Sequence, residues 1–317
     1  MNNLQSLVSS LKIVVLAGGV GGAKLADGLY RVLPPENLTV IVNTGDDFQH
    51  LGLTVCPDLD TVMYTLADVA NTETGWGRAG ESWRTIEAIG RLGGADWFRL
   101  GDLDLATHLT RTQLLSEGMS LTAVTQHLAQ KLNITCSLLP MSSQPAPTMI
   151  ETEEGILPFQ TWFVKERWQP VVKNILLPED VKATLPVMQA LETADLVLIA
   201  PSNPFVSVAP ILNVYPIRSM IEDLPQAVIA VSPIVGGQAV KGPAAKMMQE
   251  MGLAVTTTAV AQHYGDLIDG FVYDEQDAGA LDHLDIAGLC VNTLMKNSDD
   301  RIRLAQDVLT FAANLIT

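Results

Sequence analysis

Four short apolar runs, each followed by a polar or glycine-rich loop, limit the fold of this chain more than any other feature. The runs lie at residues 12–17, 39–43, 195–200 and 227–231. Runs of this length that end in turn-forming residues predict strands buried on both faces, as in a parallel sheet covered by helices. We therefore expect an α/β fold with a parallel sheet.

The remaining pattern fills in this outline. A helix is expected between the first two runs and is stopped by Pro34, which completes a strand–helix–strand unit. Residues 58–132 look mostly helical, with a short FRLGD segment that follows a predicted strand, and the tail from about 299 reads as a closing helix. Residues 147–176 alternate apolar and polar positions and predict antiparallel strands appended to the main sheet.

No internal repeat or linker interrupts the chain. We expect a single α/β domain over residues 1–317, with an embedded β-rich insertion at about 140–180.

The chain is strongly acidic, with 19 Lys and Arg against 35 Asp and Glu and a formal net charge of -16. Such a surface repels the phosphates of nucleic acids and anionic lipids, so neither nucleic acid nor a membrane is an expected partner. An anionic small substrate would need a local positive group or a bridging cation, and this is a first indication of a metal.

Cysteines and the N-terminus indicate a reducing compartment. Cys56, Cys136 and Cys290 lie far apart, without the spacing of a zinc site or a disulfide framework. The first ten residues lack the basic start and cleavage site of a signal peptide. The uncharged stretch between Asp195 and Arg218 contains four prolines, which argues against a membrane span. We expect a cytoplasmic protein.

Ligands bind open α/β sheets outside the carboxyl ends of the strands, where the four polar loops are expected to meet. The first loop, from Gly18 to Gly22, can cradle phosphates with its backbone N–H groups, although a tight packing turn would also need glycines. It lacks the third glycine of the dinucleotide fingerprint, and Lys24 does not stand in a Walker sequence. A phosphate loop of neither standard class is predicted.

The phosphate-binding candidates come from this loop, from the loops that begin at residues 201 and 232, and from a lysine further downstream whose alternative is plain solvent exposure. They are Gly18, Gly19, Gly21, Gly22, Lys24, Ser202, Asn203, Ser232, Gly236 and Lys241.

Aspartates are the candidate metal ligands, because carboxylate oxygens are what Mg²⁺ prefers. Asp46 and Asp47 follow the second strand, and Asp58 and Asp60 flank a leucine at a predicted helix start, so both can face one edge. The alternatives are that Asp58 caps the helix and that Asp46 and Asp47 are turn residues. Each of these four aspartates is a candidate Mg²⁺ ligand.

A further cluster reads RLGDLDLATH and includes Arg99, Asp102, Asp104 and His108. In a chain with few basic residues, Arg99 is a candidate contact for an anion or a ring. The two aspartates could instead cap a helix, and the histidine could be structural.

Five segments together resemble the 2-phospho-L-lactate transferases, a family that serves the biosynthesis of the deazaflavin coenzyme F-420. They are GGVGGAKLADG (18–28), NTGDDFQHLGLTVCPDLDTVMYTLA (43–67), RLGDLDLATHLTRT (99–112), APSNP (200–204) and SPIVGG with VKGPAAK (232–246). The matching blocks cover nearly the whole chain in the family's order, and PDLDT with GD-D-ATH is the most specific pair.

The resemblance implies a three-layer Rossmann-like fold and a homodimer. It also implies transfer of a phosphoester unit from a three-carbon (C3) acid activated by guanosine diphosphate to the ribityl hydroxyl of the deazaflavin precursor FO, with release of GMP. Asp60, Arg99, Asp102, Asp104 and His108 are then expected to bind FO. Asp46, Asp58 and Asp60 fall where the family's Mg²⁺-associated aspartates lie, and the glycine, Ser202 and Ser232 loops would hold the guanine nucleotide. We predict Asp60 as the proton acceptor, although a metal-bound carboxylate is a weak base.

Two rival functions remain open. A regulator of the related gluconeogenesis-factor group would share the fold and bind a nucleotide sugar without catalysis. A nicotinamide oxidoreductase is disfavoured by the incomplete fingerprint. The sequence does not distinguish phospholactate, phosphoenolpyruvate and phosphoglycerate as the transferred acid.

Overall fold

A seven-stranded parallel sheet forms the centre of the fold in the computed structural model, which describes residues 10–316. β1 lies in its interior between β9 and β2, and every neighbouring pair of strands is parallel. In spatial order the strands are β14 (Ala287–Val291), β13 (Gly270–Asp274), β10 (Ala227–Val231), β9 (Leu196–Ile199), β1 (Ile13–Ala17), β2 (Leu38–Val42) and β5 (Ser137–Pro140).

The apolar runs form strands because both faces of the sheet are covered. Successive side chains of a strand point to opposite faces. In β1, Ile13, Val15 and Ala17 belong to one hydrophobic core, whereas Val14 and Leu16 belong to the other. This explains why the run is continuously apolar rather than alternating.

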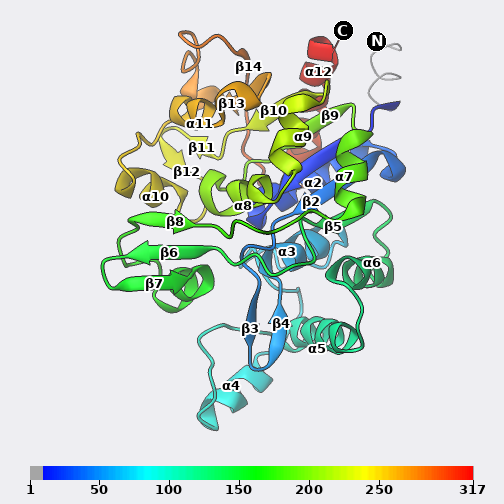
Figure 1. Ribbon diagram of the computed structural model, residues 1–317, viewed down its shortest axis with the longest axis vertical. Coiled ribbons are helices and arrows are strands. Elements are labelled where there is room, and N and C mark those ends of the chain that lie inside the picture. Colours follow the sequence, from blue (N-terminus) through cyan, green and yellow to red (C-terminus); the bar gives the residue numbers. More distant parts are fainter. Residues whose placement is uncertain (1–9, 317) are drawn as a thin grey trace.

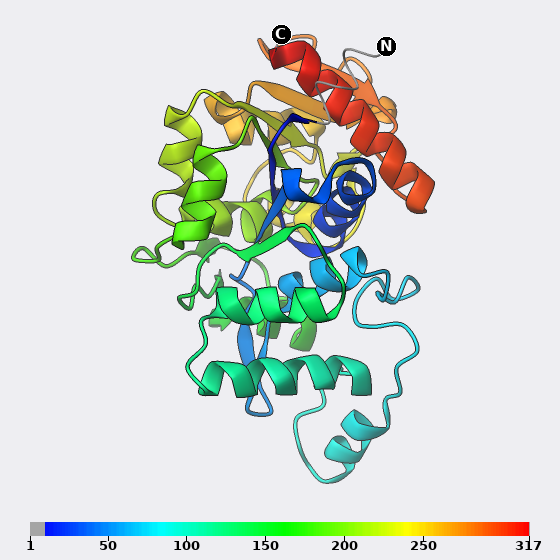
Figure 2. The same cartoon turned by 90° about the vertical axis from the view of Figure 1, so that its right-hand side faces the viewer.

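Two layers of helices enclose the sheet (Figures 1 and 2). One face carries α2 (Gly19–Val32), α3 (Pro57–Leu66), α6 (Leu121–Lys131) and α12 (Ser298–Ile316), and α12 packs against α2. The other face carries α7 (Leu185–Glu192), α8 (Ala209–Asn213), α9 (Ile217–Asp223), α10 (Ala244–Glu250) and α11 (Thr257–Tyr264). The expected three-layer Rossmann-like fold with a β-rich insertion is confirmed.

Below this body, as drawn in Figure 1, lies a smaller layer that contributes to the site. It contains the hairpin of β3 (Phe48–His50) and β4 (Leu53–Val55), α4 (Arg84–Arg91) and α5 (Asp102–Ser116). The segment that follows α3, light blue in Figure 2, descends from the sheet to α4.

Two local predictions are wrong. The antiparallel strands of the insertion, β6 (Met149–Thr152), β7 (Gly155–Pro158) and β8 (Asn174–Leu176), form a sheet of their own instead of extending the main sheet. The edge position beside β2 is taken by β5. No strand precedes Arg99, because residues 92–101 connect α4 to α5 as irregular backbone.

A short ribbon of β11 (Ile234–Val235) and β12 (Gln238–Ala239) follows β10. Within residues 10–316 no helix is both long and apolar enough to cross a bilayer. The three cysteines are unpaired. Residues 1–9, which carry most of the argument about a signal peptide, lie outside the described part of the chain.

Candidate functional site

The carboxyl ends of β1 and β9 are joined by one serine. Ser202, just after β9, donates its hydroxyl to the carbonyl oxygen of Gly18 at 2.8 Å and accepts from the Gly18 N–H at 3.1 Å. The glycine loop and the Pro201–Ser202 loop therefore touch, as predicted for loops at one edge of a parallel sheet. The hydroxyl of Ser202 is used to hold these loops together.

Glycines are needed here because other groups approach the backbone closely. A Cβ at Gly18 would lie 2.5 Å from Oδ2 of Asp58, and a Cβ at Gly22 would lie 2.6 Å from Oγ of Ser202. At Gly21 the added atom would overlap the backbone carbonyl oxygen of Pro201. The packing interpretation of the loop is thus correct for these three positions, and it leaves the first-turn N–H groups of α2 facing the same edge.

Replacement of Gly21 by alanine is expected to destabilise the protein by about 1–3 kcal/mol, because a backbone carbonyl cannot move aside as a side chain can. Urea unfolding monitored by circular dichroism measures this loss. Gly288→Ala is the matched control, since its methyl would meet only the Leu281 and Tyr273 side chains, at 3.3 and 3.4 Å. Equal stability of the two variants would contradict the packing argument.

Asn43, at the end of β2, holds two of the predicted aspartates. Its Nδ2 donates to Oδ1 of Asp46 and to Oδ2 of Asp58, both at 2.9 Å. The other oxygen of Asp58 accepts from the Gly19 N–H, at the N-terminus of α2, at 2.8 Å. The helix dipole favours a carboxylate at this place. Asp46 and Asp58 thus lie on either side of one amide group, beside the glycine loop.

These carboxyl groups have raised pKa values because they are buried. Burial raises the pKa of Asp58 to about 6. Burial, together with the charge of Asp58, raises the pKa of Asp46 well above its usual value. Burial also raises the pKa of the half-buried Asp47, whose Oδ1 has no hydrogen-bond partner within residues 10–316. The local concentration of negative charge is therefore unfavourable unless protons or a cation offset it.

Asp60 faces a different set of groups, although it stands only two residues from Asp58. Both of its oxygens accept from Arg111, Oδ2 from Nη1 at 3.0 Å and Oδ1 from Nη2. Arg111 is 2% exposed, and although burial opposes its charge, the Asp60 carboxylate raises its pKa. The pair is a bidentate, buried ion pair that fixes the orientation of Asp60.

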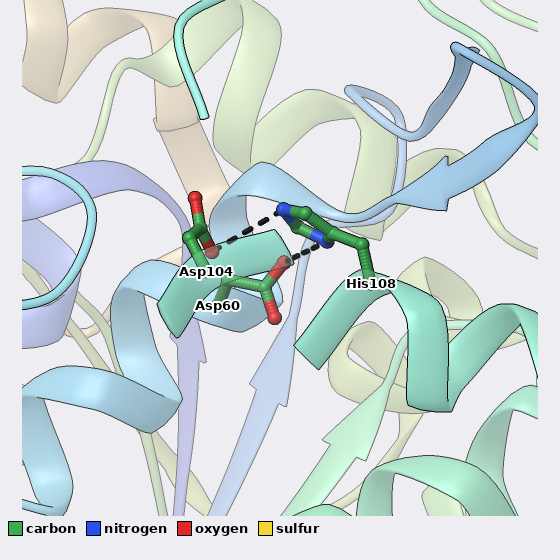
Figure 3. A group of neighbouring side chains, drawn as sticks. All are labelled: Asp60, Asp104 and His108. Carbon is green, nitrogen blue, oxygen red and sulfur yellow. Dashed lines mark ion pairs between the residues drawn. The ribbon is translucent and has the colours of Figure 1, made fainter. Parts of the chain in front are cut away.

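His108 lies between Asp60 and Asp104 (Figure 3). Its Nδ1 is 3.6 Å from Oδ2 of Asp60, and its Nε2 is 3.2 Å from Oδ1 of Asp104. Nδ1 is also 3.0 Å from Nη1 of Arg111. A guanidinium can only donate, so Nδ1 is the acceptor and the ring proton lies on Nε2, facing Asp104.

Next to this network is a cavity of about 50 Å³ with aromatic walls. Its polar residues include four of the five that were predicted to bind FO, namely Asp60, Arg99, Asp104 and His108. The guanidinium of Arg99 lies over the Trp83 ring, 4.8 Å from its centroid. The complete lining is Val55, Pro57, Asp60, Thr61, Tyr64, Trp76, Gly77, Phe98, Arg99, Asp104 and His108.

Asp102 does not reach this cavity. Its carboxylate accepts from the backbone N–H of Ser82 at 2.8 Å and from the Ser82 hydroxyl at 3.0 Å, and it is exposed. Glu81 accepts from the N–H of Asp104 at 2.6 Å, at the start of α5. Glu81 and Asp102 thus attach the segment before α4 to the N-terminus of α5.

The remaining phosphate candidates shape the loops around the N-terminus of α2. Asn203 accepts from the Phe205 N–H at 3.0 Å, and Ser232 donates to the carbonyl of Ile234 at 3.0 Å. The N–H of Gly236 donates to Asp277 at 3.0 Å.

Two lysines stand near this helix end. Lys24 donates to the carbonyl of Met295 at 2.7 Å, and Lys241 donates to that of Thr74 at 3.1 Å. Burial lowers the pKa of both, and for Lys24 the nearby Arg301 and Lys241 charges contribute. They are the local positive groups that an anionic ligand would require.

The predicted residues therefore fall into two neighbouring groups rather than one. Asp46 and Asp58 lie beside the glycine loop, whereas Asp60 lies in the aromatic cavity with Arg99, Asp104 and His108. The sequence analysis missed Asn43, Arg111 and the cavity residues Tyr64, Trp76 and Phe98. The aromatic residues between positions 43 and 112 were the available signal for the cavity. Nothing in the sequence pairs Asp60 with Arg111, a residue 51 positions away.

Two acidic groups are candidates for a divalent cation, one around Asn43 and one around His108. In the first, Asp46 and Asp58 are buried, and the nearby Asp47 has a buried oxygen without a partner among residues 10–316. Hard carboxylate oxygens of this kind suit Mg²⁺. Asp60, Asp104 and His108 also lie within 4.8 Å of one another, but a cation there would meet the Arg111 charge and the protonated face of the imidazole.

A larger cavity of about 520 Å³ lies at the opposite edge of the sheet. Its lining includes Thr39 and Ser137, which pair near the amino ends of β2 and β5, with Gln126 and Glu192. It lies at the amino ends of these strands, whereas the aspartates follow the carboxyl end of β2, and we assign it no part in the site.

Comparison with known proteins gives a consistent result over the whole chain. The sequence model of a family described as "2-phospho-L-lactate transferase CofD" matches residues 13–288. A phosphoenolpyruvate transferase of Streptomyces griseus is 42% identical over 95% of this chain and 98% of its own length. A 2-phospho-L-lactate transferase of Methanosarcina acetivorans is 39% identical over 94% of this chain and 98% of its own length.

A similar fold occurs in solved structures. A crystal structure of a Bacillus halodurans protein superimposes with a TM-score of 0.65 at 17% identity, over 94% of this chain and 99% of that one. A second structure, described as a member of the UPF0052 family from the same organism, has a TM-score of 0.62, also at 17% identity. At this level of identity the likeness concerns the fold alone.

Proposed function

This chain belongs to the 2-phospho-L-lactate transferase family, and we propose that it moves a phosphoester-linked C3 acid from a guanosine-diphosphate-activated donor to the ribityl hydroxyl of FO, releasing GMP. One observation carries the proposal most directly. The first turn of α3 places Asp58 against the glycine loop and Asp60 in the aromatic cavity, two residues apart. The proposed phosphate site and the proposed ring site therefore meet at one helix end.

In this arrangement each site takes one substrate. The N-terminus of α2, with Lys24 and Lys241, suits the diphosphate of the donor. The aromatic cavity suits the tricyclic ring of FO, with Arg99 as a cationic contact. The cavity is smaller than such a ring needs, so binding must widen it. Trp76, 42% exposed on the connecting segment, is the wall that we expect to move.

The reaction requires that the ribityl oxygen attack the phosphorus that bears the C3 acid, that the bond to GMP break, and that the hydroxyl proton leave. We assign the proton to Asp60, which Arg111 orients within the cavity. Asp46 and Asp58 would hold Mg²⁺, with Asp47 beside them, and a bound ion would supply charge neutralisation at the diphosphate.

Two further predictions belong to this proposal. The family resemblance implies a homodimer, and the unpaired cysteines suit a cytoplasmic location. The predicted role of Asp102 at FO has no support from its position, since Ser82 occupies its carboxylate.

Mass spectrometry tests the function directly. Incubation with FO, Mg²⁺ and a donor in which lactate, enolpyruvate or glycerate is esterified to the terminal phosphate of guanosine diphosphate is expected to give a product heavier than FO by one phosphoester unit, with one GMP released for each product. The acid that gives the highest kcat/KM identifies the transferred group. The two relatives named above, one for each of the first two acids, make these the leading candidates.

A nucleotide-sugar-binding regulator would behave differently in the same experiment. It would bind a guanosine or uridine diphosphate sugar, show no saturable binding of FO, and yield no product with any donor. That result would overturn the proposed transfer.

A further inference from the structure

The segment of residues 71–83 passes between the two proposed substrate sites. A Cβ at Gly75 would lie 3.9 Å from Cγ1 of Val20, in the first turn of α2, and its neighbour Thr74 accepts a hydrogen bond from Lys241. The next two residues, Trp76 and Gly77, line the aromatic cavity. The group transferred between the sites must therefore pass close to this segment.

Arg78 is the charged residue that follows. Its guanidinium lies 5.6 Å from the centroid of the Tyr64 ring, which is itself a wall of the cavity. Within residues 10–316 no hydrogen bond or ion pair reaches this guanidinium, and its Nε is buried without a partner. In a chain with 35 acidic residues, an unpaired and half-buried guanidinium is a group that calls for an explanation.

Backbone contacts position Arg78. Its backbone N–H donates to the Glu81 side chain at 3.0 Å, and Arg78 pairs with Ala70 in an isolated antiparallel bridge. Glu81 in turn accepts from the N–H of Asp104. Arg99, the arginine that lines the cavity, differs because it is exposed and lies on Trp83.

We propose that Arg78 binds the carboxylate of the C3 acid during transfer. This inference rests on the proposed function. The acids named for the two kinds of relative differ around the phosphoester carbon but share a carboxylate attached to it. One site can therefore bind both acids through this carboxylate. An arginine presents a planar fork that matches a carboxylate in a bidentate manner, and the aromatic ring beneath keeps that fork oriented.

The test compares each donor with its uncharged carboxamide analogue in the wild type, Arg78→Met, Arg78→Lys and a control, Arg84→Met. Arg84 is an exposed residue at the start of α4. The wild type and the control are expected to prefer the acid by about 100-fold in kcat/KM, the size of a bidentate charged contact. In Arg78→Met this preference should fall to within about threefold, with the loss confined to the acid and the KM for FO unchanged. Arg78→Lys should keep part of the preference, since it keeps the charge.

Binding separates this proposal from the transfer itself. Calorimetric titration of the acid and carboxamide donors without FO measures the same preference as a ratio of Kd values, even if no donor is turned over. Absence of product with a retained, Arg78-dependent Kd ratio would overturn only the proposed function. Equal losses for acid and carboxamide in Arg78→Met, or an undiminished preference, would overturn the role of Arg78.

Discussion

Asp60→Asn is expected to lower turnover by at least about 100-fold with both substrates saturating, because an amide cannot accept the ribityl proton. The substitution keeps the shape of the side chain that lines the cavity, so the KM for FO should change far less than kcat. Steady-state kinetics by GMP release measures both. Turnover within a few-fold of the wild type would show that Asp60 is not the proton acceptor.

Stability must be separated from catalysis in this experiment. Asparagine at position 60 leaves the buried Arg111 without its counter-charge, which costs about 3–5 kcal/mol in comparable cases. The double variant Asp60→Asn with Arg111→Met removes both charges, so it should recover much of the stability but none of the turnover. Asp68→Asn is the control, since Asp68 lies beyond the end of α3 on the surface and pairs with Arg31.

The parts of the fold that sequence reasoning reached are those specified by local pattern. β1, α2 and β2 follow from two apolar runs and a helical spacing that ends before Pro34. β14 was not predicted, because its residues are only partly buried at the sheet edge and their sequence looks like a loop. The insertion was predicted as strands, but which strands pair depends on contacts distant in sequence, and β5 took the edge beside β2.

The site shows the same division. The sequence places Asp58 and Asp60 at a helix start, which is a local property, and it predicted that both face one edge. Two residues of a helix differ by about 200° in direction, so the side chains diverge toward different partners. Those partners, Asn43 for Asp58 and Arg111 for Asp60, come from β2 and α5 and become neighbours only in the folded chain.

The stability of the protein is expected to depend on Mg²⁺ in a way that changes between pH 5 and pH 8. Without a cation, the folded protein holds the protons of Asp46 and Asp58 more tightly than the unfolded chain does, because both pKa values are raised. For Asp58, the stability contributed by the proton is fully present below about pH 4 and is lost as the pH rises through about 6. A shift of about two pKa units corresponds to about 3 kcal/mol, as an upper value.

Mg²⁺ competes with those protons, so its stabilising effect must have the opposite pH dependence. At pH 7.5 and about 100 times the Kd, Mg²⁺ should raise the free energy of unfolding by about 2.7 kcal/mol, and at pH 5 by much less. Urea unfolding with Mg²⁺ or EDTA at each pH measures the difference, in which the titration of groups remote from the ion cancels. An Mg²⁺-dependent increase in the free energy of unfolding that is the same at both pH values would place the metal elsewhere. No increase at either pH would contradict Mg²⁺ binding.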